Sequence, residues 1–321
     1  MNKNQTLTIL SIAISLLFSC RNNPITSKNN LGAINKDTPI TITKDSVKKT
    51  FKKHPIVSLK INAVSCKFNV QVNGYEIFSN EYIYPISGKF PINHCIQNGE
   101  NIITITQIFN NQEAIKGSSC KVSLLIKQYG DDNSEAEVIT SLKLENGKDT
   151  SLENSKMISK NSNIKFDSNK IVLQHVVSTP TNIPKWNWFS SDIITDTKEN
   201  RASLYKEYQK IHKALSNKNL KLVKQLMSER LIEYGASFNL TPQEMFVLSN
   251  IETDILDQEQ ELLPLEKIED NEFVIMGNGK LVKITRWNGA AQIIFGYKDE
   301  SLYGEYELIY RKSGDQWILT R

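Results

Sequence analysis

Polar and apolar residues alternate along much of the first half of the chain, with the period of two that is typical of a half-buried β-strand. In the clearest run, Phe68, Val70 and Val72 alternate with polar residues. Asn73-Gly74 follows, and this dipeptide favours a hairpin turn because both positions tolerate positive φ. Similar apolar runs recur at residues 103–105, 122–126, 138–144 and 171–177. The spacing predicts an antiparallel β-sandwich over residues 54–178.

After residue 200 the apolar positions follow the period of a helix. The first helix has its apolar face at Leu204, Tyr208, Ile211 and Leu215. A second is predicted from Leu220, Val223, Leu226, Met227 and Leu231, and a third from Met245, Leu248, Ile251 and Ile255. The third begins at Thr241-Pro242-Gln243-Glu244, a capping box with proline at the first helical position.

Strand patterns return from residue 262 to the end, with Asn278-Gly279 as a second hairpin turn. Tyr306, Leu308 and Tyr310 alternate with two glutamates, which predicts one strand over residues 303–312 with an aromatic face. The expected fold class is therefore α+β multidomain. An N-terminal antiparallel β-sandwich precedes a C-terminal α+β domain, residues 201–321, of three helices packed on a curled antiparallel sheet.

The chain opens with a short uncharged segment that differs from both regions. Lys3 precedes an apolar run that ends at Cys20, before Arg21. A helix that spans a bilayer needs about 20 apolar residues, and this run is shorter and diluted by Thr and Ser. The segment has the layout of an export signal, so residues 1–19 are predicted to be a cleaved signal peptide.

The end of this segment, Leu17-Phe18-Ser19-Cys20, resembles the bacterial lipobox. Phe18 is bulkier than the residue usual at its position. The resemblance implies that Cys20 is the lipid attachment site: it is diacylated (hence palmitate among the expected modifications), freed by a dedicated peptidase and then N-acylated. Several acyl chains on one residue give lasting attachment to a lipid bilayer. The alternative is an ordinary signal peptide with a chance cysteine.

By resemblance to enterobacterial lipoproteins, the absence of Asp after Cys20 favours the cell outer membrane over the inner one. Residues 21–28 also lack the acidic cluster that resembles a surface-export signal, which favours the periplasmic face. Residues 20–53 are rich in Asn, Lys, Thr and Ser, too polar to offset the chain entropy of folding, and are predicted to be a flexible tether.

Charge and length narrow the classes of partner. The chain has 321 residues, which leaves room for about two domains after the signal and tether. Its net charge is only +4, and Lys and Arg are interspersed with Asp and Glu. A nucleic-acid groove needs clustered basic residues with exposed aromatics, so no nucleic-acid partner is expected.

Two weaker resemblances concern the folded regions. The segments Phe68 to Gly74, Phe90-Pro91-Ile92-Asn93 and Asn98-Gly99-Glu100-Asn101 resemble jelly-roll domains of carbohydrate-active enzymes over about a quarter of the chain. This implies a fold and carries over no sugar-binding residue.

The ending Tyr310-Arg311-Lys312, Gly314 and Trp317-Ile318-Leu319 resembles the cone-shaped nuclear-transport-factor-like (NTF2-like) superfamily. That superfamily includes isomerases, dehydratases and non-catalytic binding domains, which all use a pocket between sheet and helices. A catalytic member generally needs Asp or His in the pocket. His212 is the histidine available here, and an edge position is favoured for it.

Three cysteines remain after Cys20. Any pairing among Cys66, Cys95 and Cys120 is open in an oxidising periplasm, with Cys95–Cys120 preferred because both lie at the edges of predicted strands. The alternative is that all three are buried thiols. No CxxC occurs and the four histidines are widely spaced, so no metal and no other cofactor is predicted. His94-Cys95 is expected to place its side chains on opposite faces of a strand.

Pro180, Pro184 and the aromatic segment 186–189 suggest an interdomain linker over residues 179–200. Trp186 and Trp188 would either stack on a sugar or peptide ligand or plug the seam between domains, and the plug is favoured.

No recognised catalytic motif occurs in the sequence, and no catalytic residue is assigned. Unpaired carboxylates such as Asp192, Asp196 and Glu266 could in principle form an acid and base pair, and linear spacing does not show whether they converge. Two functions follow as hypotheses. The favoured one is a non-catalytic envelope lipoprotein that binds a protein or a small ligand. The alternative is a periplasmic enzyme, such as a hydrolase, with its site in the C-terminal pocket or beside the tryptophans.

Overall fold

The computed structural model describes residues 52–108, 118–130, 136–145, 149–153, 160–167, 170–179, 182–297 and 303–321. The predicted signal peptide, Cys20 and nearly all of the predicted tether lie outside these residues. Within them, antiparallel β-sheets predominate and a few helices accompany them, which fits the predicted α+β class. No helix of the described residues is long and apolar enough to cross a membrane.

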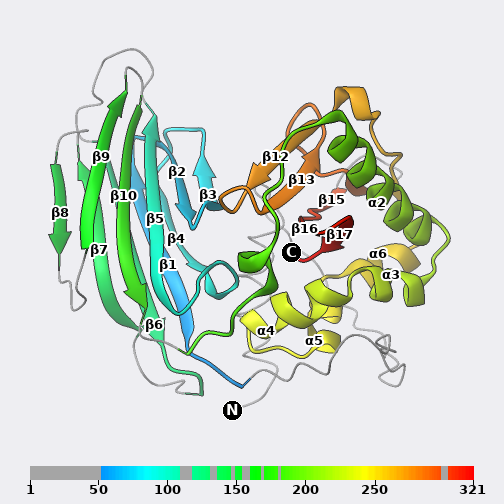
Figure 1. Ribbon diagram of the computed structural model, residues 1–321, viewed down its shortest axis with the longest axis horizontal. Coiled ribbons are helices and arrows are strands. Elements are labelled where there is room, and N and C mark those ends of the chain that lie inside the picture. The colour runs from blue at the N-terminus through cyan, green and yellow to red at the C-terminus, as the bar shows by residue number, and fades with distance from the viewer. Residues whose placement is uncertain are drawn as a thin grey trace.

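Residues 54–179, here called the two-sheet region, form two five-stranded antiparallel sheets (Figure 1). The first sheet has the order β4 (Ile86–Pro91), β1 (Ile56–Val64), β6 (Ser119–Lys127), β7 (Glu137–Glu145) and β8 (Asp149–Glu153). The second has the order β3 (Tyr75–Asn80), β2 (Lys67–Val72), β5 (Gly99–Ile108), β10 (Lys170–Thr179) and β9 (Lys160–Asp167). The sequence patterns did not indicate β8 and β9.

The inward residues of both sheets belong to one hydrophobic core. Along β1, Val57, Leu59 and Ile61 are fully buried and alternate with more polar positions, as a strand with one buried face requires. The hairpin predicted at Asn73-Gly74 is confirmed, since it joins β2 to β3 with φ of 53° and 74°.

Strand β7 departs from the predicted alternation. Val138 was expected to face the core with Leu142, but it is exposed and Ile139 is buried instead. The register between β6 and β7 shifts between Leu124 and Leu125, so one extra residue of β7 changes which face its side chains take. A bulge of this kind reverses a period-two pattern without any change in composition.

Residues 182–321, here called the helix-and-sheet region, begin with the short helix η2 (Asn187–Ser190) and the 19-residue helix α2 (Lys198–Ser216). The predicted second helix is divided into α3 (Leu220–Leu226), the π-helix η3 (Arg230–Tyr234) and α4 (Gly235–Ser237). The predicted third is divided into α5 (Pro242–Leu248) and α6 (Ile251–Leu256), because Asn250 takes a left-handed conformation with φ of 57°. The capping box that starts α5 is confirmed.

The strands of this region form two sheets rather than one curled sheet. One has the order β11 (Gln260–Leu262), β14 (Ile293–Tyr297) and β15 (Tyr303–Tyr306). The other has the order β12 (Glu272–Met276), β13 (Leu281–Thr285), β16 (Tyr310–Ser313) and β17 (Gln316–Leu319), and a short helix η4 (Ile268–Asp270) precedes β12. The Asn278-Gly279 turn joins β12 to β13 as predicted, with φ of 55° and 86°.

The single strand predicted over residues 303–312 is wrong. The chain leaves the first sheet after Tyr306 and enters the second at Tyr310. Leu308 and Ile309 are both buried but lie in different hydrophobic cores, so the chain must change direction between them. The backbone N–H of Ile309 donates to the carbonyl of Arg321 at 2.9 Å, which fixes this crossing beside the last strand.

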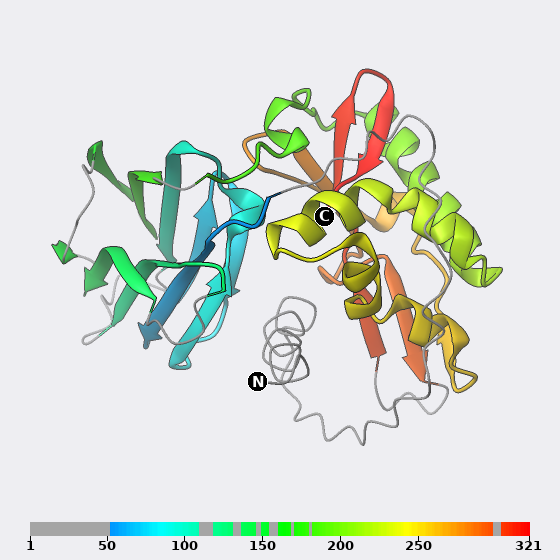
Figure 2. The same cartoon turned by 90° about the horizontal axis from the view of Figure 1, so that it is seen from below.

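The two regions share a core. Trp186, Trp188, Ala236, Leu281 and Ile309 of the helix-and-sheet region belong to the hydrophobic core of the two-sheet region. Figure 2 shows the two regions side by side, with the C-terminus within the helix-and-sheet region, on the side nearer the two-sheet region. A functional site formed by both regions would therefore lie among the residues where the two regions meet.

Candidate functional site

The contact surface between the two regions is here called the seam, and the two predicted tryptophans lie in it. Trp186 and Trp188 are 0% and 1% exposed. The indole Nε1 of Trp186 donates to the carbonyl of Asn93 at 2.7 Å, and that of Trp188 donates to the carbonyl of His94 at 3.1 Å. Phe189 stacks on Trp188 with ring centroids 3.9 Å apart. Both indoles thus anchor η2 to the two-sheet region.

A short helix, η1 (Asn93–Cys95), presents His94 to the seam. The expectation that His94 and Cys95 lie on opposite faces of a strand is therefore wrong. The His94 ring is enclosed by Tyr75 and Tyr234, both with centroids at 5.1 Å, and by Phe238 at 5.9 Å. Burial lowers the pKa of His94 to about 3, and the charge of Arg321 adds to the effect. His94 is a neutral packing residue at ordinary pH.

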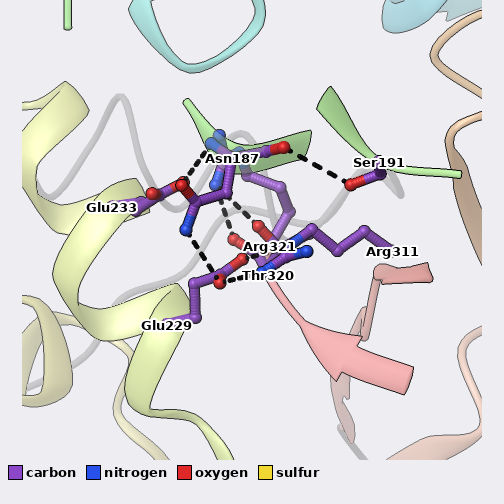
Figure 3. Close-up of polar contacts among 7 residues, drawn as sticks. All are labelled: Asn187, Ser191, Glu229, Glu233, Arg311, Thr320 and Arg321. Carbon is purple, nitrogen blue, oxygen red and sulfur yellow. Dashed lines mark hydrogen bonds and ion pairs between the residues drawn. The ribbon is translucent and has the colours of Figure 1, made fainter. Parts of the chain in front are cut away.

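Figure 3 shows a cluster of charged and polar side chains, and one of its members, Arg321, lies over the Tyr234 ring at 5.8 Å from the centroid. Arg311 forms a two-pronged ion pair with Glu229, with Nε and Nη2 at 2.6 and 2.5 Å from the two carboxylate oxygens. Asn187 donates its side-chain amide to Glu229 at 3.1 Å and its backbone N–H to Glu233 at 3.0 Å. Ser191 donates its hydroxyl to the carbonyl of Asn187 at 3.4 Å. These bonds connect helix η3, and Glu229 directly before it, to the segment that carries the tryptophans.

Glu229 and Arg311 each stabilise the charged form of the other, which burial alone would disfavour. Burial alone would raise the pKa of Glu229, but the hydrogen bonds and charge of Arg311 outweigh it, so that the pKa is lowered. Burial alone would lower the pKa of Arg311, and Glu229 outweighs that effect, so that the pKa is raised. The pair is ionised and fixed in place, which suits a structural role more than proton transfer.

Arg321 completes the cluster. Its guanidinium donates to the carbonyl and hydroxyl of Thr320 at 2.7 and 3.1 Å and to the carbonyl of His94 at 3.1 Å. Its Nε has no hydrogen-bond partner in the structure, and burial lowers the pKa of the group. The side chain is 2% exposed. Arg321 therefore ties the last strand to the two-sheet region from inside the seam.

A groove opens at one side of the seam and encloses about 390 Å³. The two hairpin turns meet at this groove, since Gly277 N–H donates to the carbonyl of Gly74 at 2.8 Å. The groove is lined by Asn73, Gln97, Glu100, Trp188, Asn278 and Lys280, among others. The Nζ of Lys280 donates to the carbonyl of Phe189 and supports that wall. The groove has polar rims around an aromatic wall.

The interior of the C-terminal sheets is filled by side chains. Tyr306, Leu308 and Tyr310 are each less than a tenth exposed and belong to the hydrophobic core of this region. Tyr306 donates its hydroxyl to Asp254, whose pKa is raised by burial. His212 is half-buried on α2, and its Nε2 lies 2.9 Å from the carbonyl of Leu263. His212 thus contacts a loop, as expected for an edge position.

The predicted Cys95–Cys120 disulfide does not form. Cys66, Cys95 and Cys120 are all free and buried. The Cys95 thiol donates to the carbonyl of Ile92 within its own turn at 3.1 Å, whereas Cys120 lies in β6 opposite Ala63 of β1. The described residues contain no group of three or more His, Cys, Asp or Glu side chains that would hold a metal ion.

The sequence indicated the seam through its tryptophans but not through its charges. Glu229, Glu233, Arg311 and Arg321 lie in stretches whose charge pattern resembles a solvent-exposed face, and only the tertiary structure buries them. The signal available in the sequence was the aromatic segment 186–189, which is followed by polar residues. No family model, no curated protein and no solved structure matches the chain.

Proposed function

We propose that the protein is an envelope lipoprotein, anchored to the outer membrane through acylated Cys20 and facing the periplasm. There it serves as a non-catalytic binding or accessory module for a protein partner or a small ligand. In this proposal the two-sheet region is a β-sandwich spacer and the helix-and-sheet region is a cone-like binding domain. The lipobox and the polar stretch after it support the anchor and its tether.

The observation that carries the non-catalytic proposal is that the buried charged side chains are engaged in structural hydrogen bonds and an ion pair. Arg311 donates directly to Glu229 within the helix-and-sheet region, and Arg321 donates across the seam to the backbone carbonyl of His94. A catalytic acid or base instead needs a perturbed pKa at a site that a substrate can reach. The filled interior beneath Tyr306, Leu308 and Tyr310 also supports binding at the surface over turnover in a pocket.

The anchor is tested by mass spectrometry of the mature protein purified from membranes. Acylated Cys20 at the N-terminus is expected. An intact Met1 or an unmodified Cys20 would contradict the anchor. The binding role is tested by pull-down with the detergent-solubilised protein, and the Cys20→Ala variant, which should leave the membrane fraction, is the control for capture through lipid.

The alternative is a periplasmic hydrolase, and the groove beside Trp188 is the observation that favours it. Glu100 and Lys280 border an aromatic wall there, as polar groups do in many ligand pockets. Turnover of a cell-wall or glycan library that is abolished by Glu100→Gln would support the hydrolase. If the library is turned over no faster than in buffer without the protein, and a specific partner is captured, the binding module is supported.

A further inference from the structure

The loop between β3 and β4 displays three consecutive large apolar side chains to solvent. Tyr82, Ile83 and Tyr84 are 65%, 55% and 66% exposed, and no other such run occurs among the residues that the structure describes. The nearest charged residues are Glu81 and Lys89, so the seven residues between them carry no charge. Single apolar residues on a surface are ordinary, whereas a contiguous group marks a surface that binds something.

The side chain of Asn80, which is buried, holds this loop in shape. Its Oδ1 accepts from the backbone N–H of Tyr82 at 3.2 Å, and its Nδ2 donates to the carbonyl of Tyr84 at 3.3 Å. The two tyrosine rings lie with their centroids 6.1 Å apart. Because two backbone polar groups of the tip are bonded within the loop, moving the tip into surroundings with less water costs less. The loop is also ordered before it binds, which reduces the entropy lost on binding.

The loop lies at the end of the two-sheet region that points away from the seam. Strand β3 begins beside the seam, since Gly74 directly before it accepts from Gly277 N–H, and it ends at Asn80. Strand β4 begins at Ile86, opposite Ala63 near the end of β1, and leads back to η1 in the seam. Strands of six residues rise about 20 Å, so the tip stands about that far from the seam.

We propose that Tyr82, Ile83 and Tyr84 insert into the interfacial layer of the lipid bilayer to which the protein is tethered. Tyrosine is enriched at membrane–water interfaces, where its ring meets the acyl chains and its hydroxyl stays with the headgroups. The isoleucine between the two tyrosines supplies a fully apolar side chain for the acyl region. The loop is then a second contact with the membrane and fixes how the folded regions are oriented on it.

The predicted tether is long enough to permit this contact. Residues 20–53 lead to His54, whose Nε2 lies 2.9 Å from the carbonyl of Ala236 in the seam. From there the nine residues of β1 run about 30 Å towards the end that carries the loop. A chain of the tether's length spans at most about 120 Å. Lipid on Cys20 and the loop can therefore reach the same bilayer.

The exposed area favours a bilayer over a second protein as the occupant. Three side chains of this size and exposure offer about 400 Å², since a buried aromatic side chain covers about 150–250 Å². A stable protein interface covers about 800 Å² on each partner, so this loop alone is too small for one. A tether keeps the loop at a high effective concentration beside the membrane, where a weak contact is enough.

The inference rests on the proposed function for its location beside a bilayer, and the test separates the two. Protein purified from membranes is reconstituted into vesicles of phosphatidylcholine and phosphatidylethanolamine. Ile83→Cys carries an environment-sensitive fluorophore on the loop, and Ser216→Cys, exposed at the end of α2, carries it as the control. The unsubstituted protein gives the labelling background, because its described thiols are buried. Nitroxide groups on the lipid acyl chains quench a fluorophore that enters the bilayer.

A second pair of variants tests the tyrosines themselves. Tyr82→Ser with Tyr84→Ser is combined with the label at residue 83, and Trp287→Ser, which removes an aromatic side chain that is 71% exposed elsewhere, is its matched control. We expect quenching at residue 83 to be several times that at residue 216. The quenching should be lost without the two tyrosines and kept without Trp287, because only the former lie in the inserting loop.

Equal quenching at residues 83 and 216, or none at either, overturns the proposal. Fluorescence from residue 83 that is shifted to the blue without vesicles and is not quenched with them also overturns it, and assigns the loop to a contact with protein. Mass spectrometry of the same sample reads the state of Cys20 separately. An unmodified Cys20 contradicts the proposed anchor, whereas the comparison of the two labelled positions decides on the loop.

Discussion

At the scale of single residues, the most consequential one is His94, because its burial makes folding depend on protonation. In the unfolded chain histidine has a pKa of about 6.5. In the folded protein the pKa of His94 is about 3, lowered by burial and then by Arg321. Below about pH 6.5 the unfolded state therefore takes up a proton that the folded state does not.

We predict that the free energy of unfolding falls as the pH drops from about 6.5 towards 3, by up to about 1.4 kcal/mol per pH unit from this residue. Urea unfolding between these values measures the slope. The His94→Phe variant keeps an aromatic ring among Tyr75, Tyr234 and Phe238 but does not titrate. It should lose this part of the slope, and an unchanged slope would show that His94 does not carry it.

The three thiols should be unreactive in the folded protein. Burial raises the pKa of Cys66 to about 11, and it raises those of Cys95 and Cys120 further. Only the thiolate reacts with iodoacetamide. At pH 8 we expect no label on these residues in the native state and one label on each in denaturant, counted by mass spectrometry. Native labelling, or two missing labels in denaturant, would contradict the buried free thiols.

Residues with a local reason for their conformation were predictable. Asn73, Gly74 and Asn278 occupy positive φ in tight turns, and the sequence alone indicates this. His94 and Arg321 were not predictable as partners. They are 227 positions apart, and the sequence around each gives no sign of the other.

At the scale of elements, a regular period predicted well whether a segment is a helix or a strand, but it predicted poorly whether that element is continuous. Helix α2 and strand β2 have unbroken patterns and formed as expected. The strand predicted over 303–312 and the third predicted helix are interrupted where the chain must reach two cores or turn at Asn250. Period alone gives no sign of the first demand, because Leu308 and Ile309 are as apolar as their neighbours. The second break lies at Asn250, a residue type that tolerates the left-handed conformation, but the apolar period continues across it.

The start of α5 gives a test at this scale. The Thr241 hydroxyl accepts from Glu244 N–H at 3.2 Å, and Glu244 accepts from Thr241 N–H at 2.8 Å. Thr241→Ala removes the first bond and should lower the free energy of unfolding by about 1 kcal/mol. Thr241→Ser retains a hydroxyl and should cost much less. Chemical unfolding measures both, and equal losses would mean that the hydroxyl does not cap the helix.

At the scale of the whole molecule, the seam makes the two regions dependent on each other. Composition suggested a join of Pro and aromatic residues between two domains, and the two tryptophans of that segment are buried together with residues of both regions. The buried guanidinium of Arg321 lies in the same contact surface, where it donates to the carbonyl of His94. Separating the regions would expose both the indoles and this charge to water. We therefore expect both regions to unfold in one transition.

The contact between the two hairpin turns allows this dependence to be measured with matched variants. Gly74 and Gly279 both have positive φ, 74° and 86°, so alanine costs about 1–2 kcal/mol of backbone strain at either one. A Cβ on Gly74 would lie 2.5 Å from Asn278 Oδ1 and 2.7 Å from its backbone N, across the seam. A Cβ on Gly279 would meet only Ile193 at 3.5 Å.

Gly74→Ala should therefore lower the free energy of unfolding by about 1–3 kcal/mol more than Gly279→Ala, the cost of forcing the turns apart. Tryptophan fluorescence reports on the seam, and far-ultraviolet circular dichroism reports on both regions. If the regions depend on each other, both signals in Gly74→Ala shift to the same lower denaturant midpoint, because weakening one turn weakens the whole structure. Equal losses in the two variants, or fluorescence that changes before the circular dichroism, would mean that the regions are held by the chain rather than by the seam.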